Sequence, residues 1–326
     1  MTQANDLQKL IEEIFIDSFN MSFPLQGRKW LSLLEEDRRF GLRIRPDLDL
    51  DRSHLGFTFS SNRLGLRGPC AAAGPGVIFG TSYAMGFAVD NGCNWYDDPL
   101  FHKEFLNLGL PVGFSHMREM LDQHYTGPGE TGVFLYHPNI WTFCVDFARW
   151  QASGQSLFDF MRWQTGLEAA LEKSLARVRA TTPTGMDGQI IEKIGDRHYL
   201  FNPNYALFNP DKFAIYYATG ADDLKQISRR FKRFIAIRIP MKEELAADLT
   251  AHHALVRLTE NHRAGWAHFK SVISEAAPGA EFYDNLPLTL TDYHPCDTHW
   301  NEGGNACFQR HLLSILGTDL PAKIGD

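Results

Sequence analysis

The segment from Gly76 to Tyr83, with the sequence GVIFGTSY, places the strongest constraint on how this chain folds. Its apolar residues between two glycines are typical of a short buried strand. The strand should end at Gly80, and a helix should begin beside Ser82. A serine at such a corner points its hydroxyl out of the sheet edge, beside the N–H groups of the first helical turn. Ser82 is therefore either a nucleophile or a helix N-cap, where serine is common.

Further strands and helices follow in alternation. Residues 105–109, 131–136 and 234–240 are expected to be strands, with a helix over 116–124 between the first two. This rhythm predicts an α/β fold, a three-layer α/β/α sandwich around a mostly parallel sheet. Because ligands bind at the carboxyl ends of such strands, Ser82, Gly113 and Asn139 should lie together there.

The chain is expected to have two parts. Residues 1–56 form a helical and extended segment packed on a main domain of residues 57–326, with an insertion or lid near 181–220. Apolar spacing predicts helices over 7–15, 29–37 and 156–180, and one over 242–274 that breaks near residue 250. A hydrophobic fraction of 44% is enough for a large core.

Charge and cysteine content narrow the possible partners and the location. The net charge of -7, with no long basic run, argues against a nucleic-acid partner. No apolar stretch suits a secretory signal or a membrane span. The five cysteines lack CxxC spacing, which favours reduced thiols and a cytoplasmic protein. The oligomeric state stays open.

Near the end of the chain, Asp297 and His299 stand two positions apart in an expected turn. A carboxylate that accepts from one imidazole nitrogen fixes the tautomer, so that the other nitrogen can take a proton from a serine. Metal binding with His294 is an alternative use of these residues. It requires further ligands at a recognised spacing, and none is evident, so we expect no metal site.

Taken together, these segments resemble the SGNH (GDSL-like) hydrolase superfamily, and most closely its branch of polysaccharide O-acetyltransferases and esterases. The resemblance covers about residues 57–315 and rests on five short motifs. They are Asn62–Gly68, Gly80–Ser82, the loop ending at Gly113, His137–Asn139 and Asp297–Asn301. Three features depart from the family pattern. Thr81 stands in place of the usual Asp, the glycine loop has an extra residue, and one residue rather than two separates acid and base.

The resemblance implies a flavodoxin-like fold and a catalytic role for five residues. Ser82 matches the nucleophile, His299 the base and Asp297 its orienting acid, with Asp292 as a second candidate for the acid. Gly113 and Asn139 match donors of the oxyanion hole. The extra residue in the loop leaves Gly109 and Val112 as alternatives to Gly113.

The expected function is a serine-dependent ester hydrolase or O-acyltransferase that acts on an acylated carbohydrate and requires no cofactor. Arg67, Tyr83 and Trp300 are expected to contact the substrate. From its sequence context alone, Arg67 either lines the entrance of a pocket for the ligand or caps carbonyl groups in its loop. The alternative function is a carbohydrate-binding protein on the same scaffold that has lost its activity.

Overall fold

The computed structural model describes three parts of the chain, residues 33–144, 190–201 and 217–317, together with residues 152 and 154. Within these parts the undescribed positions are 38, 40, 53–56, 69–72, 111, 139, 142–143, 248, 251–252, 285 and 296–298. The helices expected over 7–15 and 156–180 lie outside the described residues.

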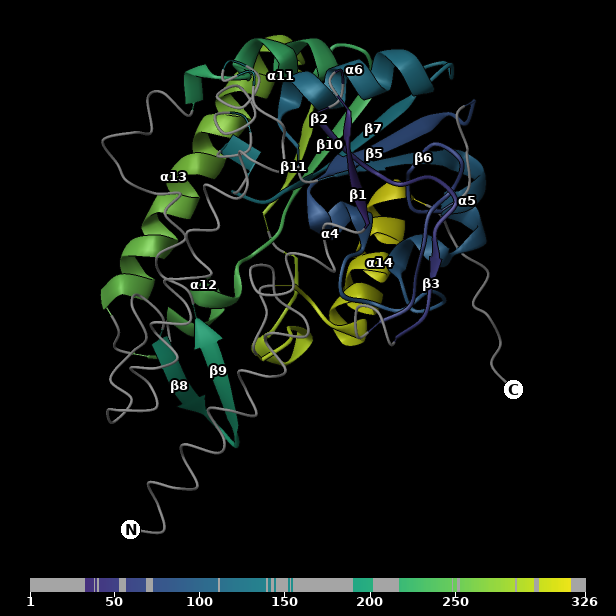
Figure 1. The fold of residues 1–326 in the computed structure, drawn as a ribbon. Helices are drawn as coiled ribbons and strands as arrows, with labels where there is room; N and C mark the ends of the chain where they lie inside the picture. The colour runs from purple at the N-terminus through teal and green to yellow at the C-terminus, as the bar shows by residue number, and fades with distance from the viewer. Residues whose placement is uncertain are drawn as a thin grey trace, which may run out of the picture.

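A five-stranded parallel sheet forms the centre of the molecule, as Figure 1 shows. Its strands are β5 (Gly76–Gly80), β6 (Phe105–Gly109), β7 (Thr131–Tyr136), β10 (Arg233–Arg238) and β11 (Glu281–Tyr283). Their order in the sheet is β11-β10-β7-β5-β6. Counted along the chain this is the order 2-1-3-4-5 of flavodoxin-like sheets, which confirms the expected α/β fold.

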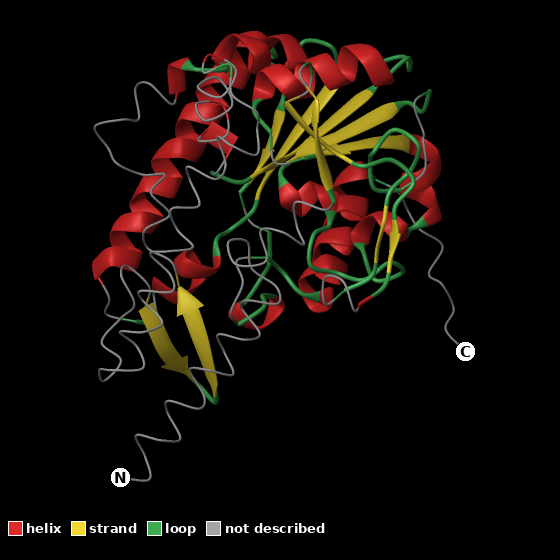
Figure 2. Ribbon diagram, in the orientation of Figure 1, coloured by secondary structure: helices red, strands yellow, loops and turns green. Residues whose placement is uncertain are grey.

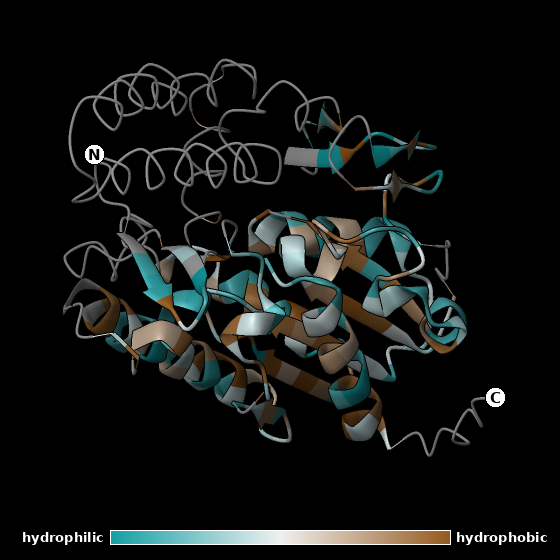
Figure 3. Ribbon diagram, turned by 90° about the horizontal axis from the view of Figure 1, so that it is seen from below, coloured by the Kyte–Doolittle hydropathy of each residue, from teal (hydrophilic) through white to brown (hydrophobic). Residues whose placement is uncertain are grey.

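Helices cover both faces of this sheet (Figure 2). Along β7, Phe134 and Tyr136 point to one face, whereas Val133 and Leu135 point to the other, as the two-residue period of a strand requires. The first face packs on α6 (Phe114–His124), α11 (Ala221–Ser228) and α13 (His253–Ala276). The second packs on α4 (Ser82–Met85), α5 (Pro99–Glu104) and α14 (Glu302–Leu316). Figure 3 shows apolar residues concentrated on the central strands.

Two short antiparallel pairs precede the sheet. β1 (Leu34–Asp37) pairs with β2 (Gly41–Ile44), and β3 (Asp49–Leu50) pairs with β4 (Phe59–Ser60). The helix expected over 29–37 is therefore wrong for residues 34–37. The neighbouring strand supplies their ladder, and Arg43 Nε binds Glu35 Oε1 across the pair at 2.5 Å. A cross-strand ion pair of this kind stabilises the strand, even where the residues have a similar propensity for helix and for strand.

The break expected near residue 250 is confirmed, because α12 (Lys242–Ala247) ends before α13 begins. Within the expected insertion, β8 (Ile190–Ile194) and β9 (Arg197–Phe201) form a hairpin. Figure 1 shows this hairpin beside α12. Tyr199 and Phe201 pack there with residues of α12 and with Leu290 of the 3₁₀ helix η4 (Leu290–Asp292). Across the described ranges, no helix combines the length and apolarity that a membrane crossing requires.

Candidate active site

Ser82 lies where β5 ends and α4 begins. Gly80 has φ +150°, and a Cβ there would lie 2.8 Å from Ala84 Cβ and 2.9 Å from Leu135 O, so the corner requires glycine. Thr81 occupies the N-cap position and makes no side-chain cap hydrogen bond. Ser82 is the first residue of the helix and is partly exposed between two buried neighbours. The tight corner thus presents the Ser82 hydroxyl at the carboxyl edge of the sheet.

The His299 imidazole meets this hydroxyl. Nε2 of His299 lies 2.7 Å from Ser82 Oγ, although 217 residues separate the two in the chain. His299 is held in a loop between η4 and α14 that is closed by the pairing of Tyr293 with Trp300. Within it the His294 N–H donates to His299 O at 3.0 Å. A serine hydroxyl bonded to an imidazole nitrogen has the geometry required for proton removal from the nucleophile.

Aromatic rings surround the His299 imidazole. The Tyr83 ring centroid lies 5.1 Å from that of His299, and the Phe87 centroid lies 5.1 Å away as well. Trp300 packs edge-on against Tyr83 at 5.0 Å and stacks on Phe308 of α14. Tyr83 and Trp300 are 2% and 0% exposed, so Tyr83 packs on the imidazole from the protein interior and Trp300 packs against Tyr83.

His137 is a residue of this site that the sequence reasoning passed over. It directly follows β7, and the centroid of its ring lies 4.9 Å from that of Tyr83. Burial and the nearby His299 lower its pKa to about 3, so His137 is neutral at neutral pH. The sequence contains a signal for His137, because His137 directly follows a strand of the parallel sheet. The same position after that strand is the reason why Asn139 was expected in the site.

Arg67 makes the contacts of the carbonyl-capping alternative. The buried guanidinium donates through Nη1 to Gly86 O and through Nη2 to Val89 O at 2.7 Å and Asn91 Oδ1 at 3.1 Å. Burial lowers the pKa of Arg67 to about 10, although Asp97 and Asp90 oppose that shift. These contacts join the Asn62–Gly68 motif to the segment that follows α4.

The end of β6 and the loop after it contain the three candidate donors for an oxyanion. The Gly109 N–H already donates to Asn107 Oδ1 at 2.9 Å, and the Val112 N–H donates to Leu110 O at 2.8 Å. Gly113 is the N-cap residue of α6 and is the candidate that remains. A Cβ at Gly113 would lie 2.9 Å from Cys144 Cα, so this close approach also favours glycine.

Two expected members of the site, Asn139 and Asp297, lie outside the described residues. The second candidate for the acid, Asp292, caps η4 instead. Its Oδ2 accepts from the N–H and the hydroxyl of Thr289, each at 2.8 Å. In the part of the chain with described positions, no group of three or more His, Cys, Asp or Glu side chains is arranged to hold a metal ion.

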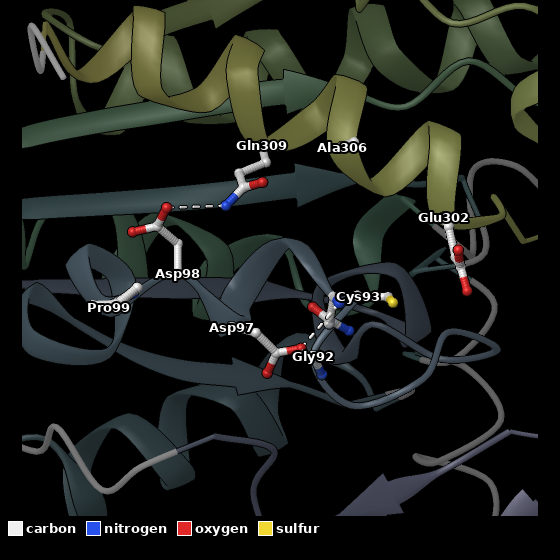
Figure 4. A pocket seen from close by; sticks show the side chains of 9 residues that line it. Gly92, Cys93, Asp97, Asp98, Pro99, Glu302, Ala306 and Gln309 are labelled. Carbon is white, nitrogen blue, oxygen red and sulfur yellow. Dashed lines mark hydrogen bonds between the residues drawn. The ribbon is translucent and has the colours of Figure 1, made fainter. Parts of the chain in front are cut away.

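A separate hollow of about 390 Å³ lies between the segment 92–99 and α14, as Figure 4 shows. Asp97, Asp98 and Glu302 line it together with Cys93 and Gln309. Two of these carboxylates have internal partners, because Asp97 accepts from the Gly92 N–H and Asp98 accepts from Gln309. Neither Ser82 nor His299 lines this hollow.

Comparisons with known proteins leave the family of the chain open. No family model and no curated protein matches it. Among solved structures it is similar to LAE5, described as an alpha/beta hydrolase enzyme from the metagenome of Lake Arreo, Spain. The identity is 11%, the match covers 76% of this chain and 96% of that chain, and the TM-score is 0.37. A likeness of this size carries no argument about fold or activity, so the functional argument depends on the site itself.

Proposed function

We propose that this protein is a serine-dependent acyl-ester hydrolase or O-acyltransferase of the SGNH type that acts on an acylated carbohydrate. The observation that carries the proposal is the 2.7 Å contact between Ser82 Oγ and His299 Nε2 at the end of a central strand. In a sheet of this order, the strand order reverses between β5 and β7, which is where such folds bind their ligands. The pair therefore lies where a substrate is expected.

In the proposed reaction, Ser82 Oγ attacks the ester carbonyl carbon while His299 Nε2 takes the hydroxyl proton. The tetrahedral oxyanion accepts hydrogen bonds from the N–H groups of Ser82 and Gly113 and from the Asn139 amide. A donor of this kind is typically worth ~3 kcal/mol in the transition state. The C–O bond to the alcohol then breaks, and the alcohol leaves with the proton from His299.

The acyl-enzyme is resolved in a second step. His299 deprotonates either water or a sugar hydroxyl, which attacks the acyl carbon and releases Ser82. Water yields the free acid and a hydroxyl acceptor yields a new ester, so exclusion of water decides between hydrolase and transferase. Asp297 is proposed to orient His299 through Nδ1. Because Tyr83 and Trp300 are buried, we propose that they act by supporting His299.

The experiment follows p-nitrophenyl acetate turnover and the labelling of Ser82 by a fluorophosphonate, with the adduct located by mass spectrometry. Ser82→Ala and His299→Asn should each lower kcat by about 10³-fold or more, because a Ser–His pair acts as a unit. The matched control is Ser115→Ala, since Ser115 Oγ also lies near an imidazole, at 3.4 Å from His116 Nδ1. This control should keep wild-type activity within twofold.

Addition of a sugar acceptor, followed by detection of the acylated sugar, separates transferase from hydrolase. A wild-type protein with neither turnover nor a Ser82 adduct would contradict the proposal. That result would favour the carbohydrate-binding alternative, which retention on an immobilised acetylated glycan would then test.

A further inference from the structure

Lys242 is a buried cation that the proposed reaction leaves without a role. It is the first residue of α12, and it is 1% exposed. Burying an ammonium group is costly unless polar groups compensate for the lost water. A cation at the first residue of a helix also gains nothing from the helix dipole, whose N-terminal end is positive. Polar groups around Nζ must therefore compensate for the lost water.

The loop that carries His299 supplies part of this compensation. Lys242 Nζ donates to Pro295 O at 3.0 Å and to His294 O at 3.3 Å. These two carbonyls belong to the loop between Tyr293 and Trp300, whose paired ends hold His299. Hydrogen bonds from a charged donor are stronger than neutral ones, so Lys242 fixes this loop from its α12 side.

A second contact fixes the same loop from the side of the nucleophile. His294 Nε2 donates to Ala88 O at 3.1 Å, just beyond α4. Ala88 has φ +66°, an uncommon conformation for a residue with a Cβ. The loop is thus held between the Ser82 segment and Lys242, and its position determines how His299 meets Ser82.

The β8–β9 hairpin contacts Lys242 through the ring of Phe201. Lys242 Nζ lies 5.6 Å from the centroid of the Phe201 ring, within the range of a cation–π contact. Phe201 is 0% exposed and packs with Ala246 and Ala247 of α12. The hairpin therefore supports the same ammonium group that donates to the His299 loop.

We propose that Lys242 is a positioning residue for His299 and that the β8–β9 hairpin acts on the active site through it. The inference rests on the proposed function. Lys242 touches neither substrate nor reacting atoms, but its two hydrogen bonds to the loop keep the imidazole at the distance that activates Ser82. Phe201 stabilises the ammonium group in that position. The hairpin, which lies outside the central sheet, thereby affects the reactivity of Ser82.

The test compares Lys242→Met with Lys242→Arg and with the matched control Lys270→Met. Lys270 Nζ also lies over an aromatic ring, at 5.4 Å from the Trp266 centroid, and pairs with an oxygen, Asp284 Oδ2 at 3.1 Å. Among the described residues, no contact joins Lys270 to the loop that carries His299. Lys242→Met should lower kcat and the rate of Ser82 phosphonylation together by about 10- to 100-fold, with KM changed less than twofold.

Lys242→Arg keeps the charge and should recover at least part of both rates, whereas Lys270→Met should keep them within twofold. Phe201→Leu serves if Lys242→Met does not fold, and it should slow phosphonylation by about 3- to 10-fold. Folding is checked by thermal unfolding. Wild-type phosphonylation in a folded Lys242→Met protein, or in a folded Phe201→Leu protein, would overturn the proposal.

Hydrogen exchange separates this inference from the proposed function, because it requires no activity. In Lys242→Met, exchange of the backbone amides in residues 293–300 should rise about tenfold or more. Where Lys242→Met does not fold, the same rise is expected in Phe201→Leu. In Lys270→Met their exchange should equal that of the wild type. An inactive wild type with this exchange pattern would contradict the proposed function alone. Unchanged exchange in these variants would contradict the link between Lys242 and the loop.

Discussion

Arg67 shows how a single side chain can join two loops that flank Ser82. Its guanidinium binds Gly86 O and Val89 O, and Gly86 O also accepts from Asn94 Nδ2 at 3.0 Å. Arg67→Met therefore leaves chiefly the buried Val89 carbonyl without its charged donor. We expect the free energy of unfolding to fall by about 2 kcal/mol, as urea titration would measure.

The same variant separates the two roles that the sequence allowed for Arg67. A carbonyl-capping residue changes stability and leaves the KM of the folded protein within twofold of the wild type. A KM raised tenfold or more at unchanged stability would instead assign Arg67 to the ligand.

At this scale the sequence predicted that Ser82 and His299 lie together, which they do, better than it predicted their surroundings. Ser82 was identified because it follows the end of a strand, and His299 because Asp297 stands two positions before it, in a segment just before the last helix. Tyr83 and Trp300 were expected to contact the substrate, yet both are buried, Tyr83 against His299 and Trp300 against Tyr83. A pattern of residues along the chain does not show which side of an aromatic ring faces the interior.

At the scale of elements, the four-residue helix α4 depends on the end of β6. A Cβ on Gly109 would lie 2.3 Å from Met85 N and 2.5 Å from Ala84 C. Gly109→Ala must therefore push α4 away, and overpacking of this kind costs about 1–3 kcal/mol. Because α4 carries Ser82, phosphonylation should slow as well. Both effects can be measured in one preparation, by urea titration and by the rate of labelling.

Gly279→Ala is the control for this variant, since a Cβ there meets nothing within 4 Å. Its free energy of unfolding should remain within about 0.5 kcal/mol of the wild type. If Gly109→Ala matched this control in both measurements, the end of β6 would not determine the position of α4.

Local pairing explains which elements the sequence predicted and which it did not. The strands β5, β6, β7 and β10 follow from their apolar runs, whereas β11 was not expected. β1 was mistaken for the end of a helix, because the acidic segment 34–37 becomes a strand only through its pairing with β2. The β8–β9 hairpin had a usable signal, since Gly195 and Asp196 form a two-residue turn between apolar runs.

For the molecule as a whole, the alternation of strands and helices predicted the layers but not the order of the strands. That order decides which strand ends meet, and it depends on pairing between segments that are far apart in the chain. The family resemblance implied a flavodoxin-like sheet, and the structure has that order. The meeting of Ser82 with His299 across 217 positions is a consequence of this topology.

Three buried histidines in different elements should make the stability of the whole molecule depend on pH. Burial lowers the pKa of His116 to about 4 and of His137 to about 3, and it lowers that of His262 well below the ordinary value. His299 lowers the pKa of His137 further, and His137 and Arg238 lower the pKa of His262 further. All three are neutral in the folded protein at pH 5, whereas in the unfolded chain they bind protons below pH ~6.5.

Because the unfolded state then binds more protons, the free energy of unfolding must fall as the pH falls from 6.5 to about 4. Each histidine contributes up to about 1.4 kcal/mol per pH unit in this window. The carboxylates of Asp90 and Glu281, whose pKa values are lowered, act in the same direction only below about pH 4. Urea titrations at pH 7, 6 and 5 should show this slope, and His116→Gln should make it shallower. Equal stability at pH 7 and pH 5 would mean that the three imidazoles accept protons within the folded core.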